Sequence, residues 1–128
     1  MSKLETPLTR KYWKKIGGTL IEEFPIVKYS KTSAPRWIDG VIIRGGERRI
    51  AQKNETDLVK GKDVIVVQTK DGRLGMYLMG QAGFSEELMK RFKPKPRSVK
   101  AVALCTEDDS VLRPLLKKYR NVKVVVLK

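Results

Sequence analysis

The sequence predicts an α/β fold in which helices cover a mixed central sheet, in the order α-β-β-β-α-β-α-β. Runs rich in β-branched residues recur along the chain, at residues 37–44, 63–70 and 99–105. A stretch with helical apolar periodicity separates the second run from the third. The last third reads strand, helix, strand, which favours a parallel β-α-β unit.

Composition favours one folded domain over residues 1–128, because 128 residues with 41% hydrophobic content can bury a real core. Lys and Arg number 28 against 14 Asp and Glu, a formal net charge of +14. This excess predicts a polyanionic partner, and nucleic acid is the commonest one. An anionic membrane is the weaker candidate.

The sequence also excludes several classes of site. It contains one cysteine, Cys105, and no histidine, which rules out a disulfide framework, most zinc sites and every histidine-dependent catalytic triad. It shows neither an apolar run long enough to span a bilayer nor the apolar region of a signal peptide. We therefore expect a soluble, cytoplasmic protein that does not bind membranes.

The first half of the chain predicts one helix and two strands. Thr6-Pro7 suits the start of a helix over residues 7–16, with Leu8, Tyr12 and Ile16 along one stripe. After Gly17-Gly18 we expect a strand over residues 19–27, a polar loop, and an antiparallel strand over residues 37–44. A short strand at residues 49–52 is a further expectation.

The second half predicts a third strand, two helices and two more strands. The strand over residues 63–70 should end in a turn at Asp71-Gly72. A helix over residues 73–92 follows. Its inner face should run through a stripe widened by Tyr77, Phe84 and Met89, and the stripe comprises Leu74, Leu78, Gln81, Ser85, Leu88 and Phe92. Strands at residues 99–105 and 122–127 should flank a helix over residues 107–119, where Thr106 and Asp109 form a capping box.

Polar residues within the apolar strands are the candidates for chemistry. Asp39 interrupts the run over residues 37–44, and Gln68 and Lys70 close the run over residues 63–70. Alternation puts Gln68 and Lys70 on the same face of their strand. The alternative is structural: Asp39 caps a turn before Gly40, and the Lys70 stem covers apolar surface while its charge reaches water.

Two glutamates on the first strand extend the set of candidates. Glu22 and Glu23 point to opposite faces, so only one of them can face whatever Asp39 faces. An exposed strand edge explains both equally well.

The predicted order of elements, with Asp39 on the second strand and Gln68-Thr69-Lys70 ending the third, resembles the PD-(D/E)XK nuclease superfamily over about residues 7–105. This superfamily includes many restriction endonucleases and archaeal Holliday-junction resolvases. Asp39 matches its first acidic residue, although Ile38 stands where the motif has proline. Gln68 stands where the second acid usually is, which is similar to the Gln-x-Lys motif of Mrr-type endonucleases.

The resemblance implies a restriction-endonuclease-like fold and a metal-dependent nuclease that hydrolyses phosphodiester bonds. It implies that Mg²⁺ or Mn²⁺ is held by Asp39, the Gln68 side-chain oxygen and the Thr69 backbone carbonyl. Glu23 or Glu22 would complete the site, with Glu5 as a third candidate. Lys70 would orient or deprotonate the attacking water. The expected partners are nucleic acid, DNA ahead of RNA, and a second copy in a homodimer.

Two rival hypotheses remain open at this point. In the first, the chain is a non-catalytic nucleic-acid-binding module on a degenerate nuclease fold, with Gln68 marking the loss of catalysis. In the second, the chain is an unrelated α/β scaffold in which Asp39 and Lys70 form a structural ion pair. Convergence of Asp39, Gln68 and Lys70 within metal-ligand reach in an open groove would exclude the second hypothesis. A cleavage assay with divalent metal ions would then separate a nuclease from a binding module.

Overall fold

The computed structural model describes residues 4–116, 118 and 122–128. Its elements are α1 (Glu5–Ile16), β1 (Thr19–Val27), β2 (Arg36–Ile43), β3 (Arg49–Ala51), the 3-10 helix η1 (Thr56–Val59), β4 (Asp63–Arg73), α2 (Met76–Lys90), β5 (Ser98–Glu107), α3 (Leu112–Leu116) and β6 (Val122–Val126). The strands form a six-stranded mixed sheet in the order β3-β1-β2-β4-β5-β6. The α/β prediction is therefore confirmed.

Both strand relationships predicted from the sequence are present. β1, β2 and β4 form an antiparallel meander, and β5 then pairs parallel to β4 after the α2 crossover. β6 pairs parallel to β5 in turn. The sheet has one strand more than the predicted order, because residues 49–51 pair parallel to β1 at the edge of the sheet.

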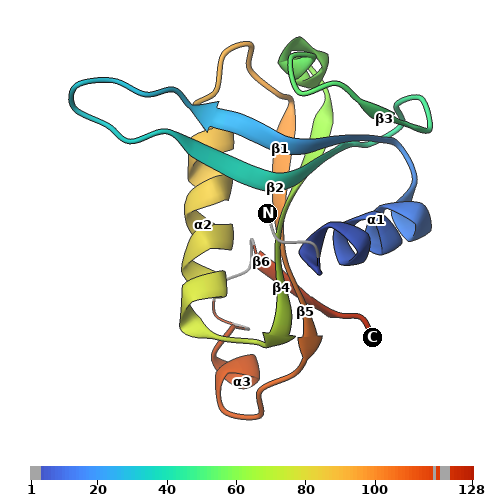
Figure 1. The fold of residues 1–128 in the computed structure, drawn as a ribbon, viewed down its shortest axis with the longest axis vertical. Coiled ribbons are helices and arrows are strands. Elements are labelled where there is room, and N and C mark those ends of the chain that lie inside the picture. The colour runs from blue at the N-terminus through green and yellow to red at the C-terminus, as the bar shows by residue number, and fades with distance from the viewer. Residues whose placement is uncertain (1–3, 117, 119–121) are drawn as a thin grey trace.

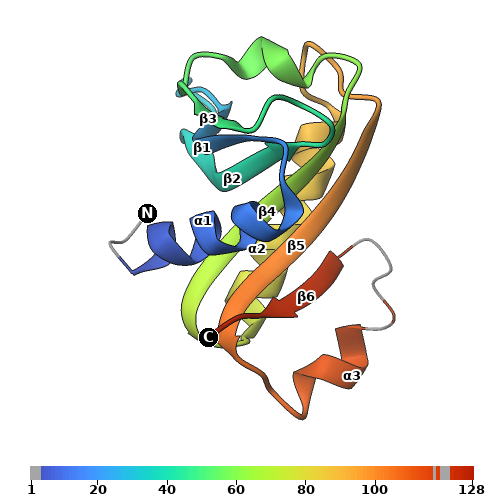
Figure 2. The same cartoon turned by 90° about the vertical axis from the view of Figure 1, so that its right-hand side faces the viewer.

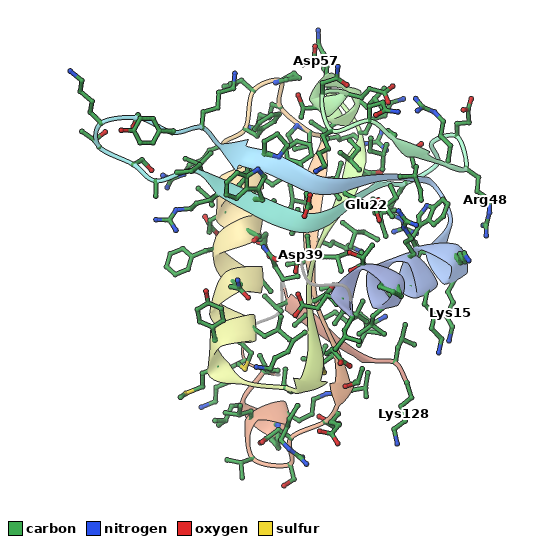
Figure 3. All side chains as sticks on the ribbon, viewed as in Figure 1. Lys15, Glu22, Asp39, Arg48, Asp57 and Lys128 are labelled. Atoms are coloured by element: carbon green, nitrogen blue, oxygen red, sulfur yellow. The ribbon has the colours of Figure 1, made fainter. Side chains whose placement is uncertain are left out.

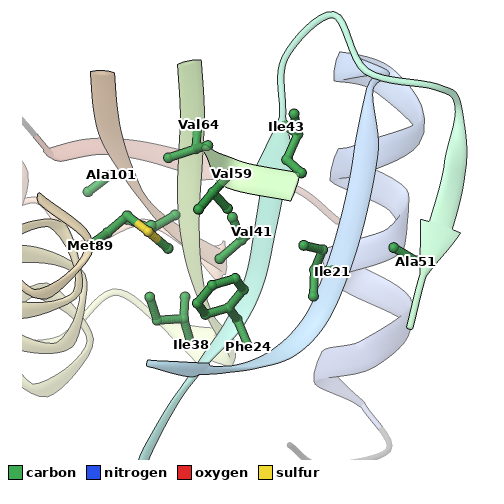
Figure 4. Close-up of a cluster of buried hydrophobic side chains, with 11 residues drawn as sticks. Ile21, Phe24, Ile38, Val41, Ile43, Ala51, Val59, Val64, Met89 and Ala101 are labelled. Carbon is green, nitrogen blue, oxygen red and sulfur yellow. The ribbon is translucent and has the colours of Figure 1, made fainter. Parts of the chain in front are cut away.

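The helices lie on opposite faces of the sheet, with α1 on one side and α2 on the other (Figure 1). On the α1 side, Leu8, Tyr12 and Trp13 pack against Leu20 and Ile42. On the α2 side, a larger cluster gathers Phe24, Val64 and Met89 with other buried apolar residues (Figure 4). The long strands β4 and β5 run the height of the molecule (Figure 2), so residues near their ends lie far from its middle.

β4 continues through the predicted turn at Asp71-Gly72. The strand ends only at Arg73, which pairs with Glu107 of β5, and the register shifts between Lys70 and Arg73. Gly72 adopts a φ of 150°, a conformation open to glycine, so the extra residue fits in a bulge rather than a turn. Pairing with the long β5 strand has overridden the local turn signal, and α2 begins at Met76 instead of residue 73.

The third helix begins later than predicted. β5 extends to Glu107, and the Thr106 hydroxyl donates to the Gly72 carbonyl at 3.3 Å instead of capping a helix. Asp109 Oδ1 accepts from the backbone N–H groups of Val111 and Leu112, at 2.9 and 2.8 Å, so Asp109 provides the cap. The predicted helical residues 117 and 119 lie outside the described part of the chain.

The inner face of α2 agrees with the predicted one at Leu78, Ser85 and Met89, but not at the two aromatic residues. Tyr77 and Phe84 are 78% and 74% exposed, whereas Leu78, Ala82 and Met89 are buried. The prediction that both aromatic rings face the sheet is therefore wrong. None of the helices in the described ranges has the length and apolar content that a membrane crossing requires.

Candidate functional site

The candidate residues meet where β2 and β4 part. Their ladder ends at the pair Gly40 and Val67, so Asp39 and Gln68 stand one position beyond the last backbone pairing. Asp39 lies between α1 and α2, below β2 in the view of Figure 3. The side chains of Asp39 from β2 and Gln68 from β4 therefore meet at the end of the ladder, between α1 and α2.

Side-chain hydrogen bonds replace the missing ladder bonds at this point. Asp39 Oδ2 accepts from the Thr69 backbone N–H at 2.8 Å, and the Asp39 backbone N–H donates to Gln68 Oε1 at 3.4 Å. Because a backbone N–H can only donate, this contact fixes the amide with its oxygen toward Asp39. Gln68 Nε2 donates to the Ser85 hydroxyl at 2.7 Å, which holds the buried amide from the α2 side.

The Asp39 carboxylate lies in an electrostatically unfavourable place. Burial raises the pKa of Asp39 to about 6, and the N–H donated by Thr69 only partly offsets that rise. The negative charges of Glu5 and Glu23 raise this pKa further. Across residues 4–116, 118 and 122–128, no lysine or arginine forms a salt bridge with Asp39.

Glu23 of β1 lies opposite Asp39 on the neighbouring strand β2, because the register pairs Glu22 with Gly40 and Phe24 with Ile38. Its φ is 48°, in the left-handed region that residues other than glycine rarely adopt. Beyond this kink, Phe24 and Ile38 both belong to the cluster on the α2 side (Figure 4). Backbone strain of this kind concentrates at functional sites.

The two glutamate candidates have different partners. Glu23 Oε2 accepts from Lys53 Nζ at 2.5 Å, and this hydrogen bond lowers the pKa of Glu23. Glu22 accepts two hydrogen bonds from Arg10 of α1, at 2.7 and 2.9 Å. Of the two, Glu23 is the one whose charge acts on Asp39.

A second hydrogen-bond chain joins α1 to the site. The Thr9 hydroxyl lies 3.0 Å from the Glu5 carbonyl and 2.7 Å from the Thr69 hydroxyl. Because Thr9 uses its only hydroxyl proton on the carbonyl, Thr69 donates to Thr9. A Cβ at Gly40 would lie 2.9 Å from Thr9 Cγ2, so only glycine next to Asp39 lets α1 come this close. The first turn of α1, with Glu5, is thereby fixed beside the site.

Lys70 does not converge with the others. It is exposed, and no salt bridge joins it to Asp39 in the described part of the chain. Its stem runs along Gly72, where an added Cβ would lie 3.5 Å from Lys70 Cε. The structural ion pair between Asp39 and Lys70 is therefore wrong, and the catalytic role of Lys70 stays a prediction.

Sequence reasoning did not identify Thr9 and Ser85, which position Thr69 and Gln68. Both are buried small polar residues on helices, at 0% and 4% exposure. Ser85 falls on the helical stripe traced in the sequence, and a hydroxyl within an apolar stripe is the signal that was available. Thr9 lies next to the Leu8 stripe and carries no comparable signal.

The oxygen atoms gathered here suit a hard divalent cation. Mg²⁺ prefers carboxylate, amide and carbonyl oxygens, and takes only one or two protein carboxylates beside water and phosphate. Asp39, the Gln68 amide oxygen and the Thr69 carbonyl are donors of that kind. The described residues hold no cluster of three or more His, Cys, Asp or Glu side chains, so an all-protein cage is not formed. The half-buried negative charge of Asp39 nevertheless fits a cation.

Comparisons with known proteins give no relative for this chain. No protein family model, no curated protein and no solved structure matches it.

Proposed function

We propose that this chain is a metal-dependent nuclease of restriction-endonuclease-like fold that hydrolyses phosphodiester bonds in nucleic acid, with DNA ahead of RNA as substrate. The observation that carries the proposal is the meeting of Asp39 with Gln68-Thr69 where β2 and β4 part. There a half-buried carboxylate with a raised pKa lacks a salt bridge to any described cation. Such perturbed carboxylates cluster at functional sites.

The topology supports the same proposal. Asp39 lies on the second strand of an antiparallel meander and Gln68-Thr69-Lys70 on the third, and α2 then crosses over to a parallel strand. This is the arrangement that the resemblance to the PD-(D/E)XK superfamily implies. Because that motif is short, the agreement of motif with topology carries more weight than the residues alone.

Each residue has a role that its position allows. Asp39 would hold the metal ion together with the Gln68 and Thr69 oxygens, and Glu23 or Glu5 would add a second negative charge. A bound Mg²⁺ or Mn²⁺ supplies the positive charge that makes water nucleophilic and stabilises the leaving oxygen. Lys70 stands two residues beyond Gln68 and is free to reach a phosphate or water from the solvent side. Ser85 and Thr9 keep the two oxygen donors in place.

Basic residues on α1 support a nucleic-acid substrate. Arg10, Lys11 and Lys14 line a shallow pocket of about 290 Å³ together with Thr6 and Pro7. Arg10 is already paired with Glu22, so Lys11 and Lys14 are the cations that would contact backbone phosphates. Such contacts do not read sequence, and they weaken steeply with salt. They would hold the substrate on the same helix whose first turn borders the Asp39 site.

Incubation of the protein with labelled DNA and RNA, as single strands, duplexes and branched junctions, tests the proposal. Cleavage should occur with Mg²⁺ or Mn²⁺ and stop in EDTA. Binding without cleavage under every condition would contradict the nuclease function. That outcome would favour the second candidate, a binding module that has lost catalysis, for which the amide of Gln68 in place of a carboxylate is the supporting observation.

A further inference from the structure

An open groove borders the candidate site on the α2 side. It has a volume of about 800 Å³ and lies between the outer part of β2 and the exposed face of α2. Trp37 and Arg36 line it from β2, Tyr77 and Phe84 from α2, and Gln68 and Ser85 from the side of the candidate site. Its size falls in the range of pockets that bind small organic groups.

The groove exposes aromatic rings that the fold does not bury. Trp37, Tyr77 and Phe84 are 57%, 78% and 74% exposed, and Met76 beside them is 77% exposed. Among the described aromatic residues only Tyr29 is comparably exposed outside this groove. A concentration of apolar surface in one groove marks an interaction site, unlike scattered single residues.

The groove and the candidate site share two residues. Gln68 and Ser85 line the groove, and they are the pair whose hydrogen bond turns the Gln68 oxygen toward Asp39. A ligand in the groove would therefore contact Gln68, whose amide oxygen accepts from the Asp39 backbone N–H. Because Gln68 and Ser85 belong to both, one nucleic-acid molecule could occupy the groove and the candidate site together.

The charge around the groove favours an anionic ligand. Arg36 lines it, and the neighbouring hairpin carries Lys28 and Lys31, whereas residues 24–38 contain no Asp or Glu. A second copy of this chain would bring a net charge of +14 to the same surface. Aromatic rings bordered by cations are instead the arrangement that binds single-stranded nucleic acid, with bases stacked on the rings and phosphates near the cations.

We propose that the groove binds unpaired bases of the nucleic acid, stacked on Trp37, Tyr77 and Phe84, beside the phosphodiester bond held at Asp39. The inference rests on the proposed function and narrows its substrate class to nucleic acid with unpaired nucleotides next to the cut. A fully paired duplex keeps its bases stacked on each other and leaves the groove empty.

Binding of fluorescently labelled single-stranded and duplex oligonucleotides in EDTA tests this proposal. Phe84→Ala should weaken single-strand binding about tenfold and leave duplex binding within about twofold, since each base stacked on an aromatic ring contributes about that factor. Tyr29→Ala is the matched control, because Tyr29 is an equally exposed aromatic residue that does not line the groove. An equal loss in both variants would overturn the proposal.

The emission of Trp37 gives a direct readout. A single-stranded oligonucleotide should quench it, while Trp13 is buried at 8% exposure and should stay unaffected. Trp37→Phe should abolish the quenching and retain most of the binding. Quenching by duplex and single strand alike would overturn the preference for unpaired bases.

Two further outcomes separate this inference from the proposed function. Single-strand binding that depends on Phe84, in a wild-type protein that never cleaves, would support the groove and contradict the nuclease. Equal cleavage of duplex and gapped DNA by wild type and Phe84→Ala would support the nuclease and overturn the groove. Light scattering that shows a dimer lost in Phe84→Ala, with unchanged oligonucleotide binding, would assign the groove to an interface between copies and also overturn it.

Discussion

The two ends of β4 lie beside aspartates with opposite surroundings, Asp63 on β4 itself and Asp39 on the neighbouring β2. At its start, Asp63 accepts hydrogen bonds from Arg97 Nε at 3.0 Å and from the Ser98 hydroxyl at 2.7 Å, and a second contact from Arg97 completes an ion pair. These partners hold the pKa of Asp63 far below its usual value. Near the other end, Asp39 receives one backbone N–H from Thr69, and burial holds its pKa well above the usual value.

The difference shows which carboxylate has its charge balanced by described residues of the chain. Asp63 has its cation and its hydrogen-bond donors within the chain, as a structural residue does. Asp39 is more buried, lies near two other negative charges and has no salt bridge to a described lysine or arginine. Within the described residues no salt bridge balances the Asp39 charge, which is the feature that the proposed metal site would use.

The sharpest test of this comparison replaces each aspartate by asparagine. Asp39→Asn should reduce cleavage by at least about a thousandfold, because it removes the charge that holds the metal ion. Its melting temperature at neutral pH should not fall, since asparagine still accepts from Thr69 and removes a buried charge. Binding to DNA in EDTA should stay within a few-fold.

Asp63→Asn is the matched control for that variant. It breaks the contacts with Arg97 and Ser98, so the melting temperature should fall while cleavage per folded molecule stays unchanged. Cleavage that survives in Asp39→Asn, or disappears in Asp63→Asn, would reverse the assignment of the two carboxylates.

Stability should respond to pH with opposite signs at the two positions. The pKa of Asp39 rises from 3.8 to about 6 on folding, so the folded state keeps a proton that the unfolded state has lost. Ionised Asp39 therefore destabilises the fold by about 3 kcal/mol above pH 6, and this cost disappears as the pH falls toward 4. Asp63 acts the other way, since its stabilising contacts are lost as the pH falls below its ordinary pKa.

Urea unfolding of wild type and Asp39→Asn between pH 4 and pH 7 measures this contribution. The difference in unfolding free energy between the two proteins isolates Asp39 from the other carboxylates. The asparagine variant should gain relative stability as the pH rises. A difference that does not vary with pH would mean that Asp39 titrates normally and is not held at a site of unbalanced charge.

A smaller loss of cleavage is expected for Lys70, which lies on β4 next to the candidate site. Lys70→Ala should lower the single-turnover cleavage rate by about a hundredfold, because the lysine acts mainly in the transition state. Its thermal unfolding should not change, since Lys70 is exposed and forms no salt bridge with Asp39. Lys123→Ala, an exposed lysine on β6, is the control for loss of general positive charge. Equal rates in both variants would remove Lys70 from the catalytic set.

The smallest expected effect concerns Gln68. Gln68→Glu supplies the acid that the superfamily usually has, so the Mg²⁺ concentration for half-maximal cleavage should fall by about tenfold. Ser85 can donate its hydroxyl to the new carboxylate, which keeps the side chain in place. Gln52→Glu is the control, because Gln52 is exposed and neither lines the groove nor takes part in the contacts of Asp39. The same Mg²⁺ dependence in wild type and Gln68→Glu would argue against Gln68 as a ligand.

The central part of the site was predictable from the sequence. Two β-branched runs joined as neighbours in an antiparallel meander put Asp39 and Gln68 on adjacent strands, whereas the register that sets them opposite each other is seen only in the structure. The choice between Glu22 and Glu23 was not predictable. It depends on the left-handed backbone at Glu23 and on Arg10 and Lys53, which lie elsewhere in the sequence.

Local signals failed where a long-range contact competed with them. Asp71-Gly72 has a strong turn signal, but pairing between Arg73 and Glu107 keeps β4 extended. The predicted stripe through Leu78 and Ser85 does pack against the sheet, but Ala82 widens it in place of Tyr77 and Phe84. Tyr77 and Phe84, which the sheet therefore leaves exposed to solvent, line the groove.

The kink at Glu23 has a consequence for how this chain evolves and how it can be engineered. A residue other than glycine at a φ of 48° costs on the order of 1 kcal/mol of stability. Selection for stability alone would favour glycine or asparagine there, whereas selection for a second acid beside Asp39 would keep glutamate. Position 23 is therefore a place where the two pressures oppose each other, and libraries sorted separately for thermostability and for cleavage should diverge there first.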